Sequence, residues 1–246
     1  PLQAFTHDDD GNLIQETKVR PYLLSAKSIK SHGSAGEFGI DLPLTGTGGA
    51  GIECRQDGPT TIELQFTDPV TIGCDNVTLS SGSCYSVALV TGATSTYRIS
   101  MSDAAANACL TIALDGVNDG YGHPLVGVKQ VKVVVLLGDV NASGGVNVTD
   151  LNAIQGQLNQ PVTESNFRCD VDAGGGINVI DLQQAQGNLN ATASCSSLPE
   201  ANTMPPERQL TWDAENRLTA VEPVHPVEGD KKLTFAYDYM GRRVQK

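Results

Sequence analysis

The chain has 246 residues, including 26 glycines and 12 prolines, so it can hold two or three small domains with many turns. Its formal net charge of −12 would repel phosphate backbones, which argues against nucleic acid as a partner. The aromatic content of 5% argues against one large enzyme core, and no apolar run reaches the roughly 18 residues of a membrane-spanning helix. We therefore expect several small non-catalytic modules and no membrane insertion.

The N-terminal part, residues 1–33, is predicted to hold one partial repeat and a linker. The chain starts with Pro1 and shows neither an initiator methionine nor a charged and then apolar leader, so we expect an internal piece of a larger polypeptide. Residues 5–13 (FTHDDDGNL) combine an aromatic residue with Asp, Gly and Asn in a pattern that returns near the C-terminus. Such a pattern is typical of a β-hairpin turn.

Residues 34–137 contain short stretches that alternate between apolar and polar residues, which predict half-buried strands. These stretches are 61–67, 85–90, 96–100, 110–114 and 126–137. Turn-forming residues separate them at the spacing of an antiparallel β-sandwich. Residues 64–70 (LQFTDPV) and 114–125 (LDGVNDGYGHPL) resemble the bacterial immunoglobulin-like modules of surface proteins. The resemblance implies a spacer or an adhesive surface.

Two near-identical units follow, 139–150 (DVNASGGVNVTD) and 170–181 (DVDAGGGINVID). Each has the spacing of the twelve-residue calcium loop, in which oxygens at places 1, 3, 5, 7, 9 and 12 surround the ion. We therefore expect two calcium sites, with glycine carbonyls at the seventh places. The predicted ligands of the first loop are Asp139, Asn141, Ser143, Gly145, Asn147 and Asp150. Those of the second loop are Asp170, Asp172, Gly176, Asn178 and Asp181.

The second loop has one side-chain ligand fewer than the first. Gly174 stands where the first loop has Ser143, so water would fill that place. The second loop carries more carboxylates, and the order of the two affinities stays open. Val146 and Ile177 are predicted to pair across the two loops.

A short amphipathic helix is predicted to begin where each loop ends, at Asp150 and at Asp181. Apolar residues at i, i+3 and i+7 mark one helical face in each copy, namely Leu151, Ile154 and Leu158, then Leu182, Ala185 and Leu189. A core of roughly 50 residues is marginal, so calcium would supply much of the folding free energy, about 2.7 kcal/mol per site at 100 times its dissociation constant. We expect this segment to be disordered without calcium.

Residues 139–190 resemble the dockerin domains of secreted bacterial proteins, whose paired loops lack the incoming helix of a full EF-hand and end in Asp. The resemblance implies docking to a cohesin-like module. It places recognition at the loop-helix junctions, on Val148, Thr149, Val179 and Ile180, where the family usually has a small hydroxyl pair. Two alternatives are a calcium-stiffened linker and packing against the chain's own β-sandwich.

The C-terminal part begins after a linker predicted at 194–208. Residues 210–221 (LTWDAENRLTAV) and 235–244 (FAYDYMGRRV) resemble the Rhs or YD-repeat family. The resemblance implies β-hairpins that coil into a shell or a surface fibre, with the aromatic-Asp pair starting a turn. Since residues 5–13 carry the same signature, we expect residues 17–208 to be an insertion whose flanks pair in one sheet.

The six cysteines permit 15 sets of three disulfides, and their spacing argues against zinc. We expect Cys74–Cys84 and Cys169–Cys195 pairs, although free buried thiols are an equal alternative. The four histidines are scattered, and His32 is among those expected at the surface.

The predicted fold is mainly β and multi-domain: a partial YD repeat and linker at 1–33, an antiparallel immunoglobulin-like β-sandwich at 34–137, and a small α-helical dockerin-like domain at 138–193. A linker at 194–208 and YD-repeat hairpins at 209–246 complete it. The predicted function is that of a non-catalytic, calcium-binding scaffolding or adhesion fragment of a large bacterial protein, extracellular or at the cell surface. An alternative is the non-catalytic part of a large carbohydrate-active enzyme or Rhs-type toxin whose catalytic domain lies elsewhere.

Overall fold

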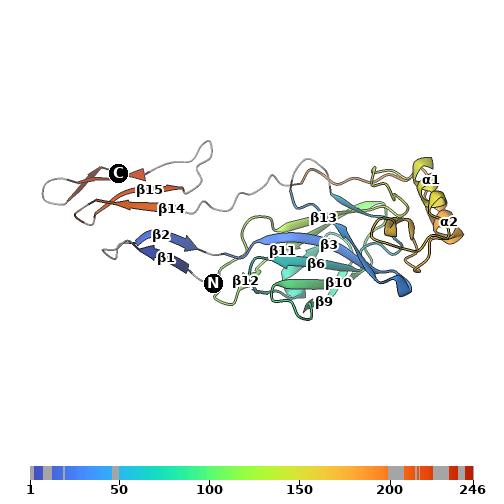
Figure 1. The fold of residues 1–246 in the computed structure, drawn as a ribbon, viewed down its shortest axis with the longest axis horizontal. Helices are drawn as coiled ribbons and strands as arrows, with labels where there is room; N and C mark the ends of the chain where they lie inside the picture. The colour runs from blue at the N-terminus through green and yellow to red at the C-terminus, as the bar shows by residue number, and fades with distance from the viewer. Residues whose placement is uncertain are drawn as a thin grey trace. The chain divides into compact units, whose positions relative to one another are not determined.

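The computed structural model describes residues 3–7, 13–18, 20–45, 50–198, 208–213, 215, 217–223, 233–237 and 242–245. The chain divides into two units, which we treat separately (Figure 1). Unit 1 joins Pro1–Arg20 to Thr203–Lys246, and unit 2 is Pro21–Asn202. Most described elements are strands, as predicted. Within the described part of the chain, neither α-helix is long and apolar enough to span a membrane.

Unit 1 contains a five-stranded antiparallel sheet in the order β1-β2-β14-β15-β16. Its strands are Gln3–His7, Leu13–Lys18, Arg208–Trp212, Leu218–Pro223 and Leu233–Thr234, and a separate pair is formed by β17 (Ala236–Tyr237) and β18 (Arg243–Gln245). β2 pairs with β14 through Glu16 opposite Arg208 and Gln15 opposite Gln209. The segments that flank unit 2 therefore share one sheet, as the sequence predicts.

The hairpin between β14 and β15 turns at the Asp of its aromatic-Asp pair. The carboxylate of Asp213 accepts hydrogen bonds from the amides of Glu215 (3.0 Å) and Arg217 (2.9 Å), and the Arg217 Nε donates to it at 2.8 Å. A short polar side chain that satisfies amides ahead of it favours a turn. The predicted turn position is thus observed.

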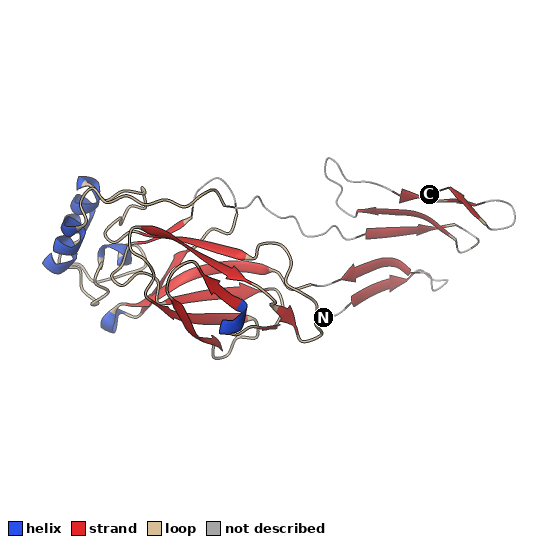
Figure 2. Cartoon of the chain, turned by 180° about the vertical axis from the view of Figure 1, so that it is seen from behind, coloured by secondary structure: helices blue, strands red, loops and turns tan. Residues whose placement is uncertain are grey.

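Unit 2 contains two larger sheets, whose strands are drawn in red in Figure 2. The five-stranded sheet has the order β4-β3-β6-β10-β9 and consists of Glu37–Asp41, Leu23–Ser31, Thr61–Phe66, Thr96–Ser102 and Ser83–Leu89. The four-stranded sheet has the order β5-β13-β11-β8 and consists of Gly51–Glu53, Gln130–Val135, Ala108–Leu114 and Val77–Leu79. A small pair joins β7 (Val70–Thr71) to β12 (Asn118–Asp119). Among the described strands of unit 2, β5 and β13 pair in parallel and the other strand pairs are antiparallel.

Alternating side chains of both sheets meet in one apolar core. Ile62, Leu64 and Ile99 come from the five-stranded sheet, and Leu110 and Ile112 come from the four-stranded sheet. Each of them is at most 1% exposed. The alternation read from the sequence therefore corresponds to one buried face in each sheet. We call the part of unit 2 formed by these two sheets the two-sheet region.

The two-sheet region begins earlier than residue 34. β3 lies within the expected linker yet pairs with both β4 and β6. Its inward positions include Ser28 and Lys30, which are buried, so the strand does not show an apolar alternation. Similarly, the final strand predicted at 126–137 is only six residues long.

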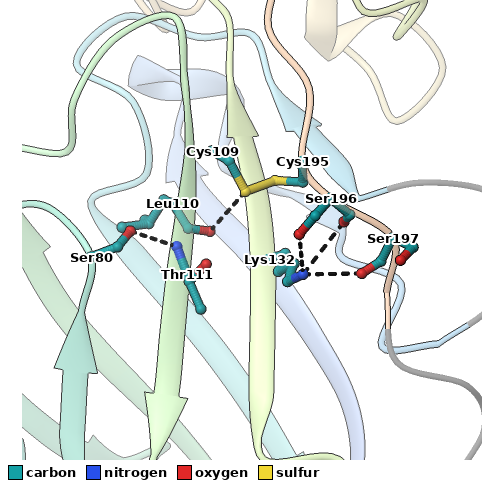
Figure 3. Close-up of a disulfide and its surroundings, with 8 residues drawn as sticks. All are labelled: Ser80, Cys109, Leu110, Thr111, Lys132, Cys195, Ser196 and Ser197. Carbon is teal, nitrogen blue, oxygen red and sulfur yellow. Dashed lines mark hydrogen bonds between the residues drawn. A yellow bond between two sulfur atoms is a disulfide. The ribbon is translucent and has the colours of Figure 1, made fainter.

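Two disulfides form in unit 2. Cys74–Cys84 closes a short loop of 10 residues, as predicted, whereas Cys195 pairs with Cys109 and not with Cys169. Cys169 is a buried free thiol, as is Cys54. The prediction of a Cys169–Cys195 pair was wrong because Cys195 lies in an extended segment that returns to the four-stranded sheet (Figure 3).

This exit segment, residues 190–198, is held against β11 and β13 at several points. Lys132 of β13 donates hydrogen bonds to the Ser196 Oγ (2.8 Å) and to the Ser197 carbonyl (3.0 Å), beside the disulfide (Figure 3). Ala191, Ala193 and Cys195 pack onto Ile52, Val134, Leu136 and Val146. The expected linker at 194–208 is described only at 194–198 and 208, and its first five residues are docked in this way.

The two predicted helices are α1 (Val148–Gly156) and α2 (Val179–Gly187), which lie in contact (Figure 1). Ile154 of α1, Ala185 of α2 and Phe167 between them belong to the same core cluster as the two-sheet region. The helical segment is therefore continuous with that region in unit 2, and no separate core begins at residue 138. Val146 and Ile177 lie in different clusters, so their predicted pairing was wrong.

Candidate metal centre

The first and last carboxylates of each predicted loop are fully buried inside the loop. Asp139, Asp150, Asp170 and Asp181 are all 0% exposed. The first carboxylate of each loop accepts two amide hydrogen bonds of 2.7–3.1 Å, from Ser143 and Gly144 for Asp139 and from Gly174 and Gly175 for Asp170. The last carboxylate also accepts two, of 2.8–3.1 Å, from Asn141 and Asn147 for Asp150 and from Asp172 and Asn178 for Asp181. The two loops thus fold alike around inward-facing oxygens.

Three carboxylates converge in the second loop. Asp170, Asp172 and Asp181 each offer an oxygen, and these oxygens lie within 4.8 Å of one another. The first loop has only two carboxylates, because Asn141 and Ser143 take the middle places. Ser143 Oγ lies 3.1 Å from the Gly145 carbonyl oxygen, so these two predicted metal ligands are also close together. Both sets consist of hard oxygen atoms, which suit calcium.

The ninth residue of each loop is also the N-cap of a helix. The side-chain oxygen of Asn147 accepts from the Thr149 amide at 2.8 Å, and that of Asn178 accepts from the Ile180 amide at 2.8 Å. Such caps satisfy amides at the start of a helix. The helices therefore start at the residue after each Asn, two residues before the Asp150 start read from the sequence.

The turn at the sixth place needs a backbone that glycine adopts readily. Gly144 and Gly175 have φ of 87° and 92°. A side chain with a Cβ atom is strained in this region, so glycine is favoured at both positions. The equivalent backbone supports the alignment of the two loops.

The electrostatics of the loops favour a cation. Burial raises the pKa of Asp139, and amide hydrogen bonds offset this only in part. Burial also raises the pKa of Asp172, and the negative charge of Asp181 adds to the shift. In Asp170 burial is the largest influence and acts in the same direction, but the hydrogen bonds from His32 and from the Gly175 amide, together with weaker contributions, lower the pKa overall. A divalent cation would relieve the crowding of negative charge, so the residues present fit calcium.

Two basic side chains outside the loops contact them, one for each loop. Arg168 donates to the carbonyl oxygens of Val140 (2.8 Å), Asp139 (3.1 Å) and Ile52 (3.1 Å), which ties the first loop to β5. His32 follows β3 and lies 2.8 Å from Asp170 of the second loop. It is 0% exposed, so the expectation of a surface histidine was wrong.

The sequence pattern did not reveal His32 or Arg168 as parts of the centre. His32 is 138 residues from Asp170, and neither residue belongs to the repeated motif. A partial signal exists for Arg168, because it lies two residues before the second loop, where the first repeat has Leu137 in place of a basic residue. For His32 the sequence offers none, because its contact depends on the tertiary fold.

The four predicted docking residues lie on the outer surface of the helical segment. Val148, Val179 and Ile180 are 62%, 57% and 51% exposed, and Thr149 is exposed as well. They occupy the first turns of α1 and α2, which overlap the last residues of the two repeated loops. Three exposed aliphatic side chains here contrast with the buried Ile154 and Ala185 on the inner side.

Comparison with known families agrees with the loop geometry. Residues 137–190 match the model of the dockerin type I domain. Domains of this kind bind calcium and dock onto cohesin modules without catalysing a reaction. The chain matches no curated protein and no solved structure.

Proposed function

We propose that this chain is a non-catalytic, calcium-dependent docking and scaffolding part of a large secreted or cell-surface bacterial protein. The observation that carries the proposal is the division of the dockerin-type segment into two sides. Its buried carboxylates and apolar helix faces point inward, and its helix starts present exposed aliphatic residues. A segment built in this way can bind calcium and still offer a surface to a partner.

Each loop would hold one calcium ion. The ligands would be Asp139, Asn141, Ser143, Gly145 and Asp150 in the first loop and Asp170, Asp172, Gly176 and Asp181 in the second. Asn147 and Asn178 would act through water, because their side-chain oxygens cap the helices. Bound calcium supplies the positive charge that holds the loop oxygens together.

Calcium titration calorimetry of the whole chain tests this assignment. The wild type should bind two ions, and Asp139→Ala and Asp170→Ala should each lose one. Asp115→Ala is the matched control, because Asp115 is exposed in unit 2 and lies outside both loops. Absence of binding at millimolar calcium in the wild type would overturn the proposal.

The partner surface is proposed to consist of Val148, Thr149, Val179 and Ile180. A partner that matches it would present an apolar patch, as expected for a cohesin-like module. Surface-binding measurements with a type I cohesin, with and without calcium, test the docking part. Val148→Asp and Val179→Asp should abolish binding, whereas Tyr121→Asp, at a residue 75% exposed in another part of unit 2, should leave it unchanged.

The remaining parts of the chain are proposed to be structural. The two sheets of unit 2 support an immunoglobulin-like β-sandwich, and the hairpins of unit 1 support its assignment to YD repeats. Two disulfides fit an oxidising, extracellular location. Limited proteolysis of the whole chain, followed by mass spectrometry, would show whether units 1 and 2 survive as separate fragments.

A further inference from the structure

A chain of buried charged and polar groups runs from the two-sheet region to the second calcium loop. Glu53 accepts from Arg55 Nε (2.7 Å) and Nη2 (2.7 Å), and Ser28 Oγ also donates to it. Arg55 Nη1 lies 3.2 Å from His32 Nε2, and His32 Nδ1 lies 2.8 Å from Asp170 Oδ2. All five side chains are at most 1% exposed. Asp170 is the first proposed ligand of the second site.

The hydrogen-bond pattern fixes the direction in which the imidazole acts. Arg55 Nη1 is a donor, so the His32 Nε2 that faces it accepts. His32 Nδ1 therefore carries the proton and donates it to Asp170 Oδ2. The ring also makes edge contacts with Phe38 and Phe167, at centroid distances of 5.2 and 5.9 Å, which hold its plane in place. The carboxylate of Asp170 is thus oriented by a rigid neighbour.

Among the residues that the structure describes, no side chain makes a comparable contact with the opening carboxylate of the first loop. Arg168 donates only to backbone carbonyls there, and the Asp139 carboxylate accepts hydrogen bonds from two amides of its own loop. In the second loop, the Asp170 Oδ2 atom accepts from the Gly175 amide and from His32. The two sites are therefore near-identical in sequence but differ in their surroundings.

The backbone of the second loop also fits closely against the turn that carries His32. A Cβ atom on Gly175 would lie 2.7 Å from the His32 carbonyl oxygen, and one on Gly33 would overlap the Gly174 carbonyl. The two backbones are therefore in direct contact, with no room for a side chain between the loop and the turn. The position of the loop therefore depends on the fold of the two-sheet region.

We propose that His32 is a positioning residue for the second calcium site, and that the Glu53-Arg55-His32 chain couples calcium binding at this site to the two-sheet region. This proposal rests on the proposed calcium function. It adds that the second site depends on residues outside the repeat. The second site forms fully only when the two-sheet region is folded. By thermodynamic linkage, calcium at this site then stabilises that region in return.

Two substitutions separate the hydrogen bond from the packing. His32→Phe keeps an aromatic ring beside Phe38 and Phe167 but removes the donor, and Arg55 retains Glu53 and the carbonyls of Ser28 and Phe38 as partners. His32→Asn loses the ring but keeps an N–H donor near the Nδ1 position. Both are made in whole chains that carry Asp139→Ala, so that only the second site titrates.

Calorimetry with calcium chloride is the first measurement. Removing a hydrogen-bond partner of a metal ligand typically costs about 10–100-fold in affinity, so His32→Phe should weaken the second site by at least about 10-fold. His32→Asn should recover most of that loss. In the matched Asp170→Ala background, where only the first site remains, His32→Phe should change the affinity less than twofold.

Amide hydrogen exchange of the calcium-free chain is the second measurement, and it does not depend on loading. His32→Phe should speed exchange at Gly174 and Gly175, whose amides bond to Asp170, and leave Ser143 and Gly144 of the first loop unchanged.

If the wild type binds two ions and His32→Phe retains its affinity for the second, the positioning role is overturned while the calcium function stands. Equal losses in the Phe and Asn variants would also overturn it, because packing alone would then explain the effect. A wild type that binds no calcium would instead overturn the proposed function, and this inference with it.

Discussion

Replacing Cys109 and Cys195 together by serine should destabilise unit 2 more than the same change at Cys74 and Cys84. The two bonds close stretches of 86 and 10 residues. In the chain-entropy model the first contributes about 4.6 kcal/mol and the second about 2.7 kcal/mol, because the longer stretch restricts the unfolded chain more. The expected difference is therefore about 2 kcal/mol.

Urea unfolding followed by far-ultraviolet circular dichroism and by hydrogen exchange in β13 measures this loss. The single tryptophan, Trp212, lies in unit 1, so its fluorescence serves as an internal control whose midpoint should not change. The hydrogen bonds of Lys132 to Ser196 and Ser197 remain available in the variant, which isolates the covalent contribution. A loss at Cys109 and Cys195 equal to or smaller than that at Cys74 and Cys84 would refute the assigned connectivity or the entropic reasoning.

Three further predictions concern residues of unit 2. Glu53→Gln should destabilise unit 2 by about 3–5 kcal/mol at neutral pH, because it leaves Arg55 without its buried counter-charge. Burial alone would raise the pKa of Glu53, but the hydrogen bonds and charge of Arg55 lower it overall. The stability that ionised Glu53 contributes is therefore lost as the pH falls through this lowered pKa. The difference in unfolding free energy between wild type and Glu53→Gln, measured with urea, should shrink over the same pH range. Burial raises the pKa of Cys54 to about 11, so iodoacetamide at pH 8 should label this thiol only after denaturation, as read by mass spectrometry. Gly33→Ala should lower the melting temperature more than Gly92→Ala, since both have positive φ but only Gly33 faces a neighbouring backbone; equal shifts would contradict the close packing.

The calcium loops were predictable because their signal is local. Ligand spacing and the glycine turn are contained in twelve residues, and the repeat doubles the information. Both helices start two residues earlier than predicted. In the loop pattern Asn147 and Asn178 count only as loop residues, whereas in the structure they also cap the helices. Sequence patterns therefore located the two repeated loops but not the starts of the helices that follow.

The surroundings of the loops were not predictable, because they depend on contacts between distant residues. The alternation pattern of the sequence does not predict β3, because Ser28 and Lys30 occupy inward positions that are usually apolar. Those polar residues belong to the same buried region as Glu53, with which Ser28 forms a hydrogen bond. Likewise, the partner of Cys195 follows from the path of the exit segment, which no spacing rule encodes.

The sequence of β13 specifies its register in the sheet only weakly, and the exit segment helps to fix that register. Apart from Lys132, all residues at 131–137 are valine or leucine. Both faces of the strand are buried in apolar clusters, with Val133 and Val135 in one cluster and Val134 and Leu136 in the other. A slip by one position would exchange one apolar set for another, so polarity gives little preference for the native pairing. Cys109 lies opposite Val134, and its covalent link to the overlying segment restricts that slip. Unit 2 can thus contain an almost uniformly apolar strand that still pairs with its neighbour in a single register.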